Sequence, residues 1–322
     1  MTTREATPAA PRRLDALDAA RGAALVAMIF YHLTWDLKHF RLIDVDLANS
    51  ATFHWIGHAI ASVFVGVAGF SLVLAHRGGF RADAYFKRLA TIGAAAAAVT
   101  AVTYYMLPEA FIFFGILHCI AAASLAGLIF LSAPVWLILL AAAMALAAPH
   151  LVHSEAFNSP ALSWLGFGTV APYTYDFRSF FPWFGIFLIG MAAARRGFDT
   201  RFAGIRAGAA PASWLAAGGR HSLAVYLIHQ PLLYGVLLLA VQGLPRASYD
   251  EGPFLQFCHE ECAASGAAAN LCKSACACSI GETKKKGLWR VILEDKITPE
   301  QEIILREVAN SCRIEAERGL KR

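Results

Sequence analysis

Long runs of apolar residues, separated by short polar segments, occupy most of the chain up to residue 243. Seven of them have roughly 17–25 residues, the length that an α-helix needs to cross a bilayer. A polar segment, 1–19, precedes the first run, and a polar tail, 244–322, follows the last. The pattern therefore predicts an all-α, polytopic membrane helix bundle of about seven transmembrane helices (domain 20–243), with a separate tail. The predicted spans are 20–38, 56–76, 89–107, 111–132, 134–150, 179–195 and 221–243.

Composition supports a membrane protein. Of the 322 residues, 57% are hydrophobic and only 16% are charged, against roughly 25% charged in an average soluble domain. The net charge of +5 does not indicate nucleic acid binding, because the basic residues gather at the ends of the predicted spans. The alanine run 94–98 predicts a surface on which helices pack closely.

The basic residues orient the chain in the membrane. They lie before the first span, in the loop after the second and in the loop after the sixth. These three segments fall on one side of the membrane, and the positive-inside rule assigns that side to the cytoplasm. The long loop 151–178 and the tail then fall outside. The first apolar run is expected to be a retained helix and not a cleaved signal peptide. The segment before it is polar, and no signal-peptidase cleavage site follows it. The basic residues are Arg4, Arg12, Arg13 and Arg21, then Arg77, Arg81, Lys87 and Arg88, then Arg195, Arg196, Arg201, Arg206 and Arg220.

Six of the seven cysteines lie in the tail, and only Cys119 is in a span, where a small buried apolar role is expected. An even set in a segment outside the membrane predicts three disulfides. Cysteines four residues apart share one face of a helix, so two antiparallel helices would pair Cys258 with Cys276 and Cys262 with Cys272. Cys278 and Cys312 would then tie in a last helix beginning near 298–301. Six cysteines allow 15 different disulfide connectivities, and this pairing is one of them. The alternative to disulfides is a zinc site that includes His259.

Four histidines lie within the predicted spans, where a polar side chain needs hydrogen-bond partners. His32 and His229 are expected near the middle of the membrane, and His58 and His118 toward the outside with Asp36. A histidine beside a carboxylate can remove a proton from a hydroxyl or amine. We therefore expect Asp36 to orient His58 or His118 as a general base, with His32 and His229 lining a polar path. The alternative is that these histidines only bridge helices by hydrogen bonds.

A second set of polar residues lies at the cytoplasmic ends of the spans. Asp18 and Arg21 have the spacing of an ion pair at a helix start. The start of the seventh span, with Arg220 and Ser222, offers backbone N–H groups to an anion. With Arg88, these residues could hold the phosphates of a nucleotide-like donor. The alternative is that the arginines only anchor the helix ends at the membrane surface.

These polar residues belong to motifs that resemble a known family: the catalytic domain of heparan-alpha-glucosaminide N-acetyltransferase, in its bacterial members. The resemblance covers about 13–243, and the Cys-rich tail resembles an extension in a bacterial subgroup. The motifs are Arg13-Leu14-Asp15-x-Leu17-Asp18-x-x-Arg21-Gly22, Met28-x-x-Tyr31-His32-x-x-Trp35-Asp36-Leu37, Phe64-x-x-x-x-Gly69-x-Ser71-Leu72, Phe111-Ile112-Phe113-Phe114-Gly115-Ile116-Leu117-His118 and Tyr226-Leu227-Ile228-His229-Gln230-Pro231.

The resemblance implies acetyl transfer across the membrane. Acetyl-CoA would be the donor on the cytoplasmic side, no metal would take part, and an amino or hydroxyl group of a cell-envelope sugar would be the acceptor. Expected partners are the lipid bilayer, a glycan or other small polar acceptor, and a second copy of the chain in a homo-oligomer. The expected location is the bacterial inner membrane, with a cytoplasmic N-terminus and a periplasmic tail. The alternatives are a proton-coupled transporter or flippase for a small polar solute, and a non-catalytic envelope scaffold.

Overall fold

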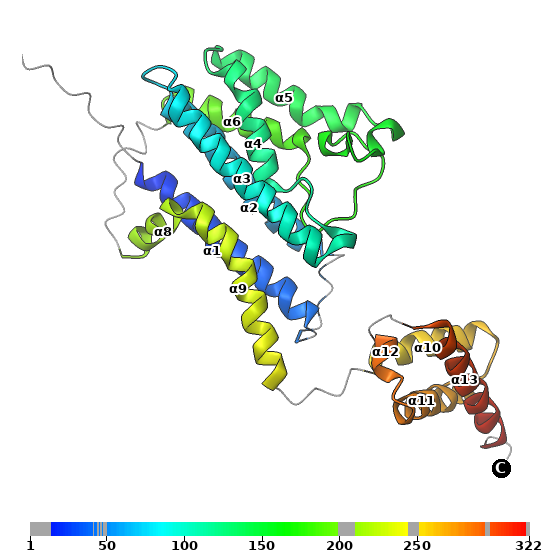
Figure 1. The fold of residues 1–322 in the computed structure, drawn as a ribbon. Helices are drawn as coiled ribbons and strands as arrows, with labels where there is room; N and C mark the ends of the chain where they lie inside the picture. The colour runs from blue at the N-terminus through cyan, green and yellow to red at the C-terminus, as the bar shows by residue number, and fades with distance from the viewer. Residues whose placement is uncertain are drawn as a thin grey trace, which may run out of the picture. The chain divides into compact units, whose positions relative to one another are not determined.

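The computed structural model describes residues 14–40, 42–43, 45, 47, 50–198, 210–243, 251–293 and 297–319. Within these ranges all regular elements are helices, and no strand occurs. The chain divides into two compact units, Met1–Leu239 and Ala240–Arg322, and each is described by itself (Figure 1). The predictions that concern Arg4, Arg12, Arg13, Arg201 and Arg206 lie outside the described residues.

Helices occupy all seven predicted spans, which confirms the all-helical membrane architecture. Four of the described helices, α1, α2, α3 and α9, are long and apolar enough to cross a membrane, and the other three predicted spans are shorter apolar helices. The helices are α1 (Asp15–His39), α2 (Ala51–Ala75), α3 (Ala82–Met106), α4 (Ile116–Gly127), α5 (Val135–Leu151), α6 (Phe180–Arg195) and α9 (Ser222–Gly243).

Among the described residues of the first unit, one α-helix lies outside the predicted spans. Helix α8 (Ala210–Arg220) precedes α9 and is separated from it only by His221. It has 11 residues, which is too short to cross a bilayer, and it includes Pro211 and two glycines. The sequence pattern therefore gave no apolar run of membrane length there.

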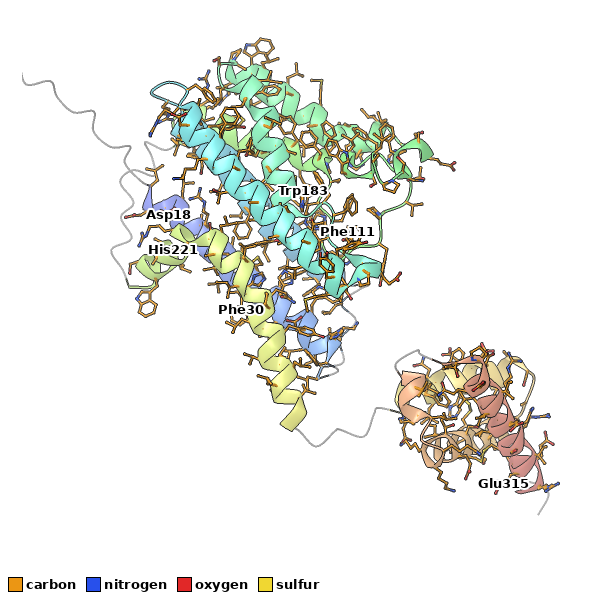
Figure 2. The ribbon with its side chains drawn as sticks, viewed as in Figure 1. Asp18, Phe30, Phe111, Trp183, His221 and Glu315 are labelled. Carbon is orange, nitrogen blue, oxygen red and sulfur yellow. A yellow bond between two sulfur atoms is a disulfide. The ribbon has the colours of Figure 1, made fainter. Side chains whose placement is uncertain are left out.

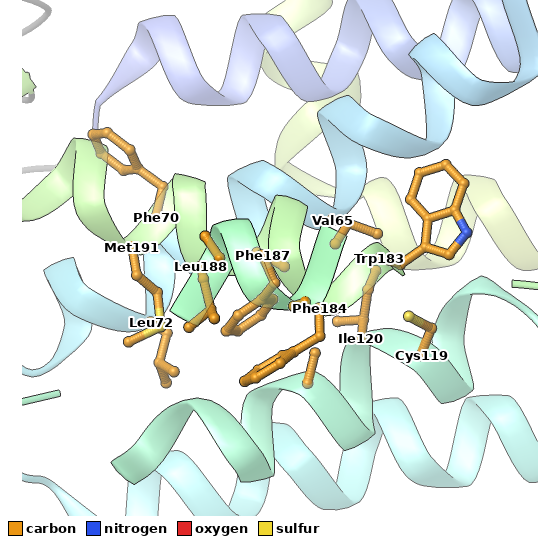
Figure 3. Close-up of a cluster of buried hydrophobic side chains, with 14 of the residues drawn as sticks. Val65, Phe70, Leu72, Cys119, Ile120, Trp183, Phe184, Phe187, Leu188 and Met191 are labelled. Atoms are coloured by element: carbon orange, nitrogen blue, oxygen red, sulfur yellow. The ribbon is translucent and has the colours of Figure 1, made fainter. Parts of the chain in front are cut away.

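The core of the first unit lies among α2, α4, α5 and α6. Figure 3 shows side chains of these helices meeting, among them Val65 of α2 and Phe187 of α6. Both are fully buried, as is Cys119 of α4, which confirms the apolar role expected for that cysteine. Ala95 and Ala96 of the predicted packing run are also buried, next to Leu117.

Glycines allow α2 and α6 to approach closely. A Cβ atom added to Gly69 of α2 would collide with the backbone of Phe187, and one added to Gly190 of α6 would collide with the backbone of Gly66. In a membrane, where lipid tails are as apolar as leucine, helices associate mainly through such van der Waals packing. The α2–α6 contact therefore depends on the absence of side chains at these positions.

Close backbone contact at glycines also joins α8 to α1. A Cβ atom on Gly22 of α1 would collide with the backbone of Leu215, and one on Gly219 of α8 would collide with the backbone of Asp18. Figure 2 shows Asp18 and His221, which follows α8, at the same end of these helices. Helix α8 is thereby held against the start of α1.

The second unit contains α10 (Gly252–Ala264), α11 (Ala269–Lys285), α12 (Trp289–Leu293) and α13 (Pro299–Gly319). Three disulfides join Cys258 to Cys276, Cys262 to Cys272 and Cys278 to Cys312, which confirms the predicted pairing. The zinc alternative is wrong, because the disulfides use all six cysteines of the tail and leave no thiol there to bind a metal.

The start of α13 is also where the sequence placed it. Thr298 Oγ1 accepts a hydrogen bond from the backbone N–H of Gln301 at 3.3 Å, and Gln301 Oε1 accepts one from the N–H of Thr298 at 3.1 Å. This reciprocal pair is a capping box, which satisfies two N–H groups that a helix start leaves unpaired.

Candidate active site

Helices α1 and α9 bring four polar side chains together. His32 and Asp36 share one face of α1, since they are four residues apart. The ring centroids of His32 and His229 are 5.1 Å apart. One turn further along α1, Gln230 Nε2 donates a hydrogen bond to Asp36 Oδ1 at 2.9 Å. We call these four residues the α1–α9 polar cluster.

Three buried atoms of this cluster have no hydrogen-bond partner among the described residues: Asp36 Oδ2, Gln230 Oε1 and His229 Nε2. The side chains are well enclosed, with Asp36 only 5% and His229 8% exposed. Native proteins seldom leave such groups unsatisfied, because the unmade hydrogen bond costs about 1–3 kcal/mol. A polar ligand or water would remove that cost.

The protonation of His229 follows from its contacts. Its Nδ1 lies 2.6 Å from the carbonyl oxygen of Tyr226, and a carbonyl can only accept. Nδ1 therefore carries the hydrogen, and in the neutral ring Nε2 holds a free lone pair. All three unsatisfied atoms are then acceptors, so the cluster is suited to a group that brings several N–H or O–H hydrogens.

The structure corrects the partner predicted for Asp36. Its carboxylate was expected to orient His58 or His118, but one oxygen accepts from Gln230 and the other has no partner within the described residues. Depth in the membrane had suggested the wrong neighbours, because residues at the same depth can face different sides of their helices.

His118 has both ring nitrogens engaged. Gly115 N–H donates to His118 Nδ1 at 3.2 Å, so Nδ1 acts as an acceptor and Nε2 carries the hydrogen. Nε2 lies 3.1 Å from Thr100 Oγ1, whose own hydrogen goes to the carbonyl of Ile112. His118 therefore joins α3 to the start of α4, and taking a proton at Nδ1 would break one of these bonds.

His58 has one nitrogen free for chemistry. It lies in the second turn of α2, which begins after Ser50, whose hydroxyl accepts from the N–H of Phe53 at 3.2 Å. Nδ1 of His58 donates to the carbonyl of His54 at 2.8 Å, which leaves the Nε2 lone pair free. The ring stacks on Trp183 with 5.6 Å between centroids. His58 is exposed, and Asp36 is not its partner.

At the opposite end of α1, Arg21 links two helices. It forms the predicted ion pair with Asp18 at 2.9 Å, and its other nitrogen donates to Ser71 Oγ of α2 at 2.6 Å. Asp18 is buried, so the ion pair is partly shielded from water. The pair is confirmed, and Arg21 links it to α2.

Arg88 lines a cavity of about 230 Å³ between α2, α3 and α4. Arg81 and His76 line the same cavity. Gathered positive charges favour an anion. The volume is below the roughly 300–1,000 Å³ of a pocket for a whole ligand of drug size. The cavity therefore fits a phosphate group of a nucleotide-like molecule better than the whole molecule.

The anion site predicted at Arg220 and Ser222 is less open than expected. The structure has α8 directly before α9, and the N–H of His221 donates to the carbonyl of Gly218 at 3.1 Å. Because this N–H already donates to a carbonyl of the chain, it is not available to a bound anion. Arg220 itself is exposed and Ser222 is half-buried.

Sequence reasoning missed four residues of these sites: Gln230, Tyr226, Thr100 and Asp176. Gln230 and Tyr226 flank His229 in a motif that was noted for its histidine alone. Thr100 gave no signal, because a threonine in an apolar span commonly bonds its own helix. Asp176, whose Oδ2 accepts the N–H of Ile116 at the start of α4 at 3.1 Å, was visible only as one of several polar residues in the loop before α6.

Comparison with protein families decides the class of protein. The family model described as heparan-alpha-glucosaminide N-acetyltransferase, catalytic, matches residues 13–231, which is more than half of the chain. The chain belongs to this family. Comparisons with curated proteins and with solved structures gave no match.

Membership in the heparan-alpha-glucosaminide N-acetyltransferase family gives the chain a general function of the membrane acetyltransferase type. The matched residues include the α1–α9 polar cluster and the Arg88 cavity, and they end at Pro231. The disulfide-bonded unit lies beyond them. The two polar sites are therefore part of the family domain, and the second unit is an addition to it.

Proposed function

We propose that the protein transfers an acetyl group from acetyl-CoA, bound on the cytoplasmic side, to an amino or hydroxyl group of a cell-envelope sugar on the far side. The observation that carries the proposal is the α1–α9 polar cluster, with three buried acceptors left without partners inside an acetyltransferase-family domain. The proposed location is the bacterial inner membrane, with the N-terminus in the cytoplasm and the disulfide-bonded unit in the periplasm.

The cluster supports a general-base role for His229. Asp36 Oδ2 and Gln230 Oε1 would accept hydrogen bonds from N–H or O–H groups of the acceptor molecule and so hold its reacting atom next to His229 Nε2. The acceptor atom attacks the acetyl carbonyl carbon, its proton passes to His229 Nε2, and the C–S bond breaks as CoA leaves with the sulfur electrons. The proton then passes from His229 to the departing thiolate, so His229 ends unchanged. Such proton transfer typically contributes about 10²–10⁴-fold in rate.

His32 lies beside His229, with 5.1 Å between the two ring centroids. From this position His32 could take over the proton that His229 accepts. A path through two neighbouring imidazoles would carry the proton along α1 without exposing the cluster to water.

Turnover with isotopically labelled acetyl-CoA tests the proposed function. Protein in proteoliposomes should release CoA and acetylate an amino sugar or a sugar hydroxyl, without needing a proton gradient. Label that stays on the protein when the acceptor is omitted would indicate a two-step transfer, and its absence would indicate a direct one. If no amine or hydroxyl acceptor is acetylated and CoA release stays at background, the proposal fails. Uptake of solute that needs a proton gradient would instead support the transporter.

Arg88 is proposed to hold a phosphate of the donor in its cavity. Arg88→Gln should raise the KM for acetyl-CoA about tenfold or more with little change in kcat, because a hydrogen bond to a charged group contributes about 1.5–3 kcal/mol. Arg195→Gln is the matched control. Arg195 is also at the end of a helix, but it donates to the carbonyl of Ala133 at 2.9 Å and does not line the cavity. Equal effects of the two variants on KM would rule out the assignment.

A further inference from the structure

The turn that joins α2 to α3 (Figure 1) brings two aromatic rings face to face. Helix α2 ends at Ala75, and the chain then turns at Gly79, whose φ of 110° is in the left-handed region that favours glycine. The N–H of Gly79 donates to the carbonyl of His76 at 3.1 Å, which closes the turn. The ring of Phe80 stacks on the ring of His76, with 5.1 Å between centroids and 22° between planes. We call these two residues the Phe80–His76 ring pair.

The ring pair stands at the edge of the Arg88 cavity. His76 lines the cavity, and its ring is fixed because Nδ1 donates to the carbonyl of Leu72 at 2.7 Å. Phe80 also contacts Tyr85, which lines the cavity from α3, with 5.6 Å between ring centroids. Phe80 itself is 52% exposed, so much of its ring is open to a ligand.

The cavity also offers positive charge that the chain does not use. Arg81 and Arg88 line it, and within the described part of the chain neither guanidinium has a hydrogen bond or an ion pair to another residue. By contrast, Arg77 of the same turn donates to the carbonyl of Ala194 at 2.6 Å. A guanidinium binds phosphate well, because its N–H groups match two phosphate oxygens at once. The cavity therefore combines an open aromatic ring with two available cations.

A nucleotide suits both features, because it joins a flat aromatic base to phosphates. Every base has a π face, so bases stack on exposed aromatic side chains. The cavity, at about 230 Å³, is too small for a whole nucleotide, so the base would lie at its edge, where Phe80 is exposed. A phospholipid head group would satisfy the arginines but would leave the ring pair without a planar partner.

We propose that the Phe80–His76 ring pair is the surface on which the adenine of the acetyl donor stacks. Arg81 and Arg88 would then hold the phosphates of the same molecule. The inference deepens the proposed acetyl transfer and rests on it for the identity of the nucleotide. The simpler role for Phe80 is that of an aromatic anchor at the membrane surface, which predicts no difference between ligands with and without a base.

Binding of radiolabelled ADP to the purified full-length protein tests the ring pair without any turnover. Phe80→Leu should weaken ADP binding about tenfold or more, because it removes the ring on which the base stacks. Phe80→Trp should restore binding to the wild-type level. Pyrophosphate, which lacks the base, should compete with equal affinity in wild type and Phe80→Leu, whereas Arg81→Gln should weaken the binding of both ligands.

Phe86→Leu is the matched control. Phe86 is another exposed phenylalanine near the start of α3, 54% exposed and in edge contact with Tyr85, but it neither lines the cavity nor stacks on His76. Its substitution should leave ADP binding unchanged. Equal ADP affinity in wild type and Phe80→Leu, or an equal loss in Phe86→Leu, would overturn the inference.

Turnover of two donors keeps this inference separate from the proposed function. Acetyl-pantetheine carries the acetyl thioester without the nucleotide, so Phe80→Leu should raise the KM for acetyl-CoA and leave that for acetyl-pantetheine unchanged. If the protein binds ADP through Phe80 but transfers no acetyl group, the proposed function fails and the nucleotide site stands. If acetyl transfer occurs but ADP binding does not depend on Phe80, the proposed function stands and the inference fails.

Discussion

His229→Gln is expected to lower kcat for acetyl transfer by about 10²–10⁴-fold, because it removes the lone pair that takes the proton of the acceptor. The imidazole is held by its Nδ1 hydrogen bond to Tyr226, and its Nε2 is one of the three unsatisfied atoms of the cluster. Glutamine is similar in size and can still donate to the Tyr226 carbonyl, so the fold should be preserved. Steady-state kinetics with labelled acetyl-CoA, together with thermal unfolding, would measure both effects.

His118→Gln provides the contrast within the same domain. Both nitrogens of His118 are engaged, one by Gly115 and the other by Thr100, so its loss should reduce stability and leave most of the turnover. The sequence alone had ranked His118 among the bases. Loss of turnover in His118→Gln together with normal turnover in His229→Gln would move the general base to α4 and refute the assignment made here.

Gly190→Ala is expected to destabilise the first unit by about 3 kcal/mol or more, at or above the upper end of typical overpacking costs. The added methyl group would collide with the backbone of Gly66 on α2. A backbone atom cannot rotate away as a side chain can, so the two helices would have to separate. Since α2 and α6 form much of the core, a lower unfolding temperature in detergent, measured by circular dichroism, should follow.

Gly93→Ala is the matched control, because it adds the same methyl group within another apolar helix. Nothing lies within 4 Å of the Cβ position at Gly93. Alanine is favoured over glycine in a helix by about 1 kcal/mol, so this variant should be as stable as the wild type or slightly more so. Equal destabilisation by both substitutions would show that the close approach of α2 and α6 does not limit stability.

The helices were predictable because their signal is local. The length of an apolar run decides whether it forms a membrane helix, and each of the seven runs became a helix. The second unit was predictable for a related reason. Cys258 and Cys262 lie one turn apart, as do Cys272 and Cys276, so the periodicity of the helix determines which sulfurs can meet when two helices pack antiparallel.

Several residues of the polar sites were also identified from the sequence, namely His32, Asp36 and His229. The residues that they contact were not identified. Distance along a helix gives depth in the membrane, at about 1.5 Å per residue, but it does not give the direction in which the helix turns that residue. Asp36 was therefore matched with histidines of similar depth, whereas the rotation of α1 turns it toward Gln230 on α9.

The sequence by itself indicated the membrane class, the seven apolar helices and a disulfide pairing that the structure confirms, because runs of apolar residues and the 3.6-residue period act within short stretches of chain. Only the tertiary structure decided which side chains share a site. It placed Thr100 on His118, Gln230 on Asp36 and the loop carboxylate of Asp176 on α4. Those contacts depend on helix rotation and on close approaches at glycines, which are settled by packing between segments far apart in the chain.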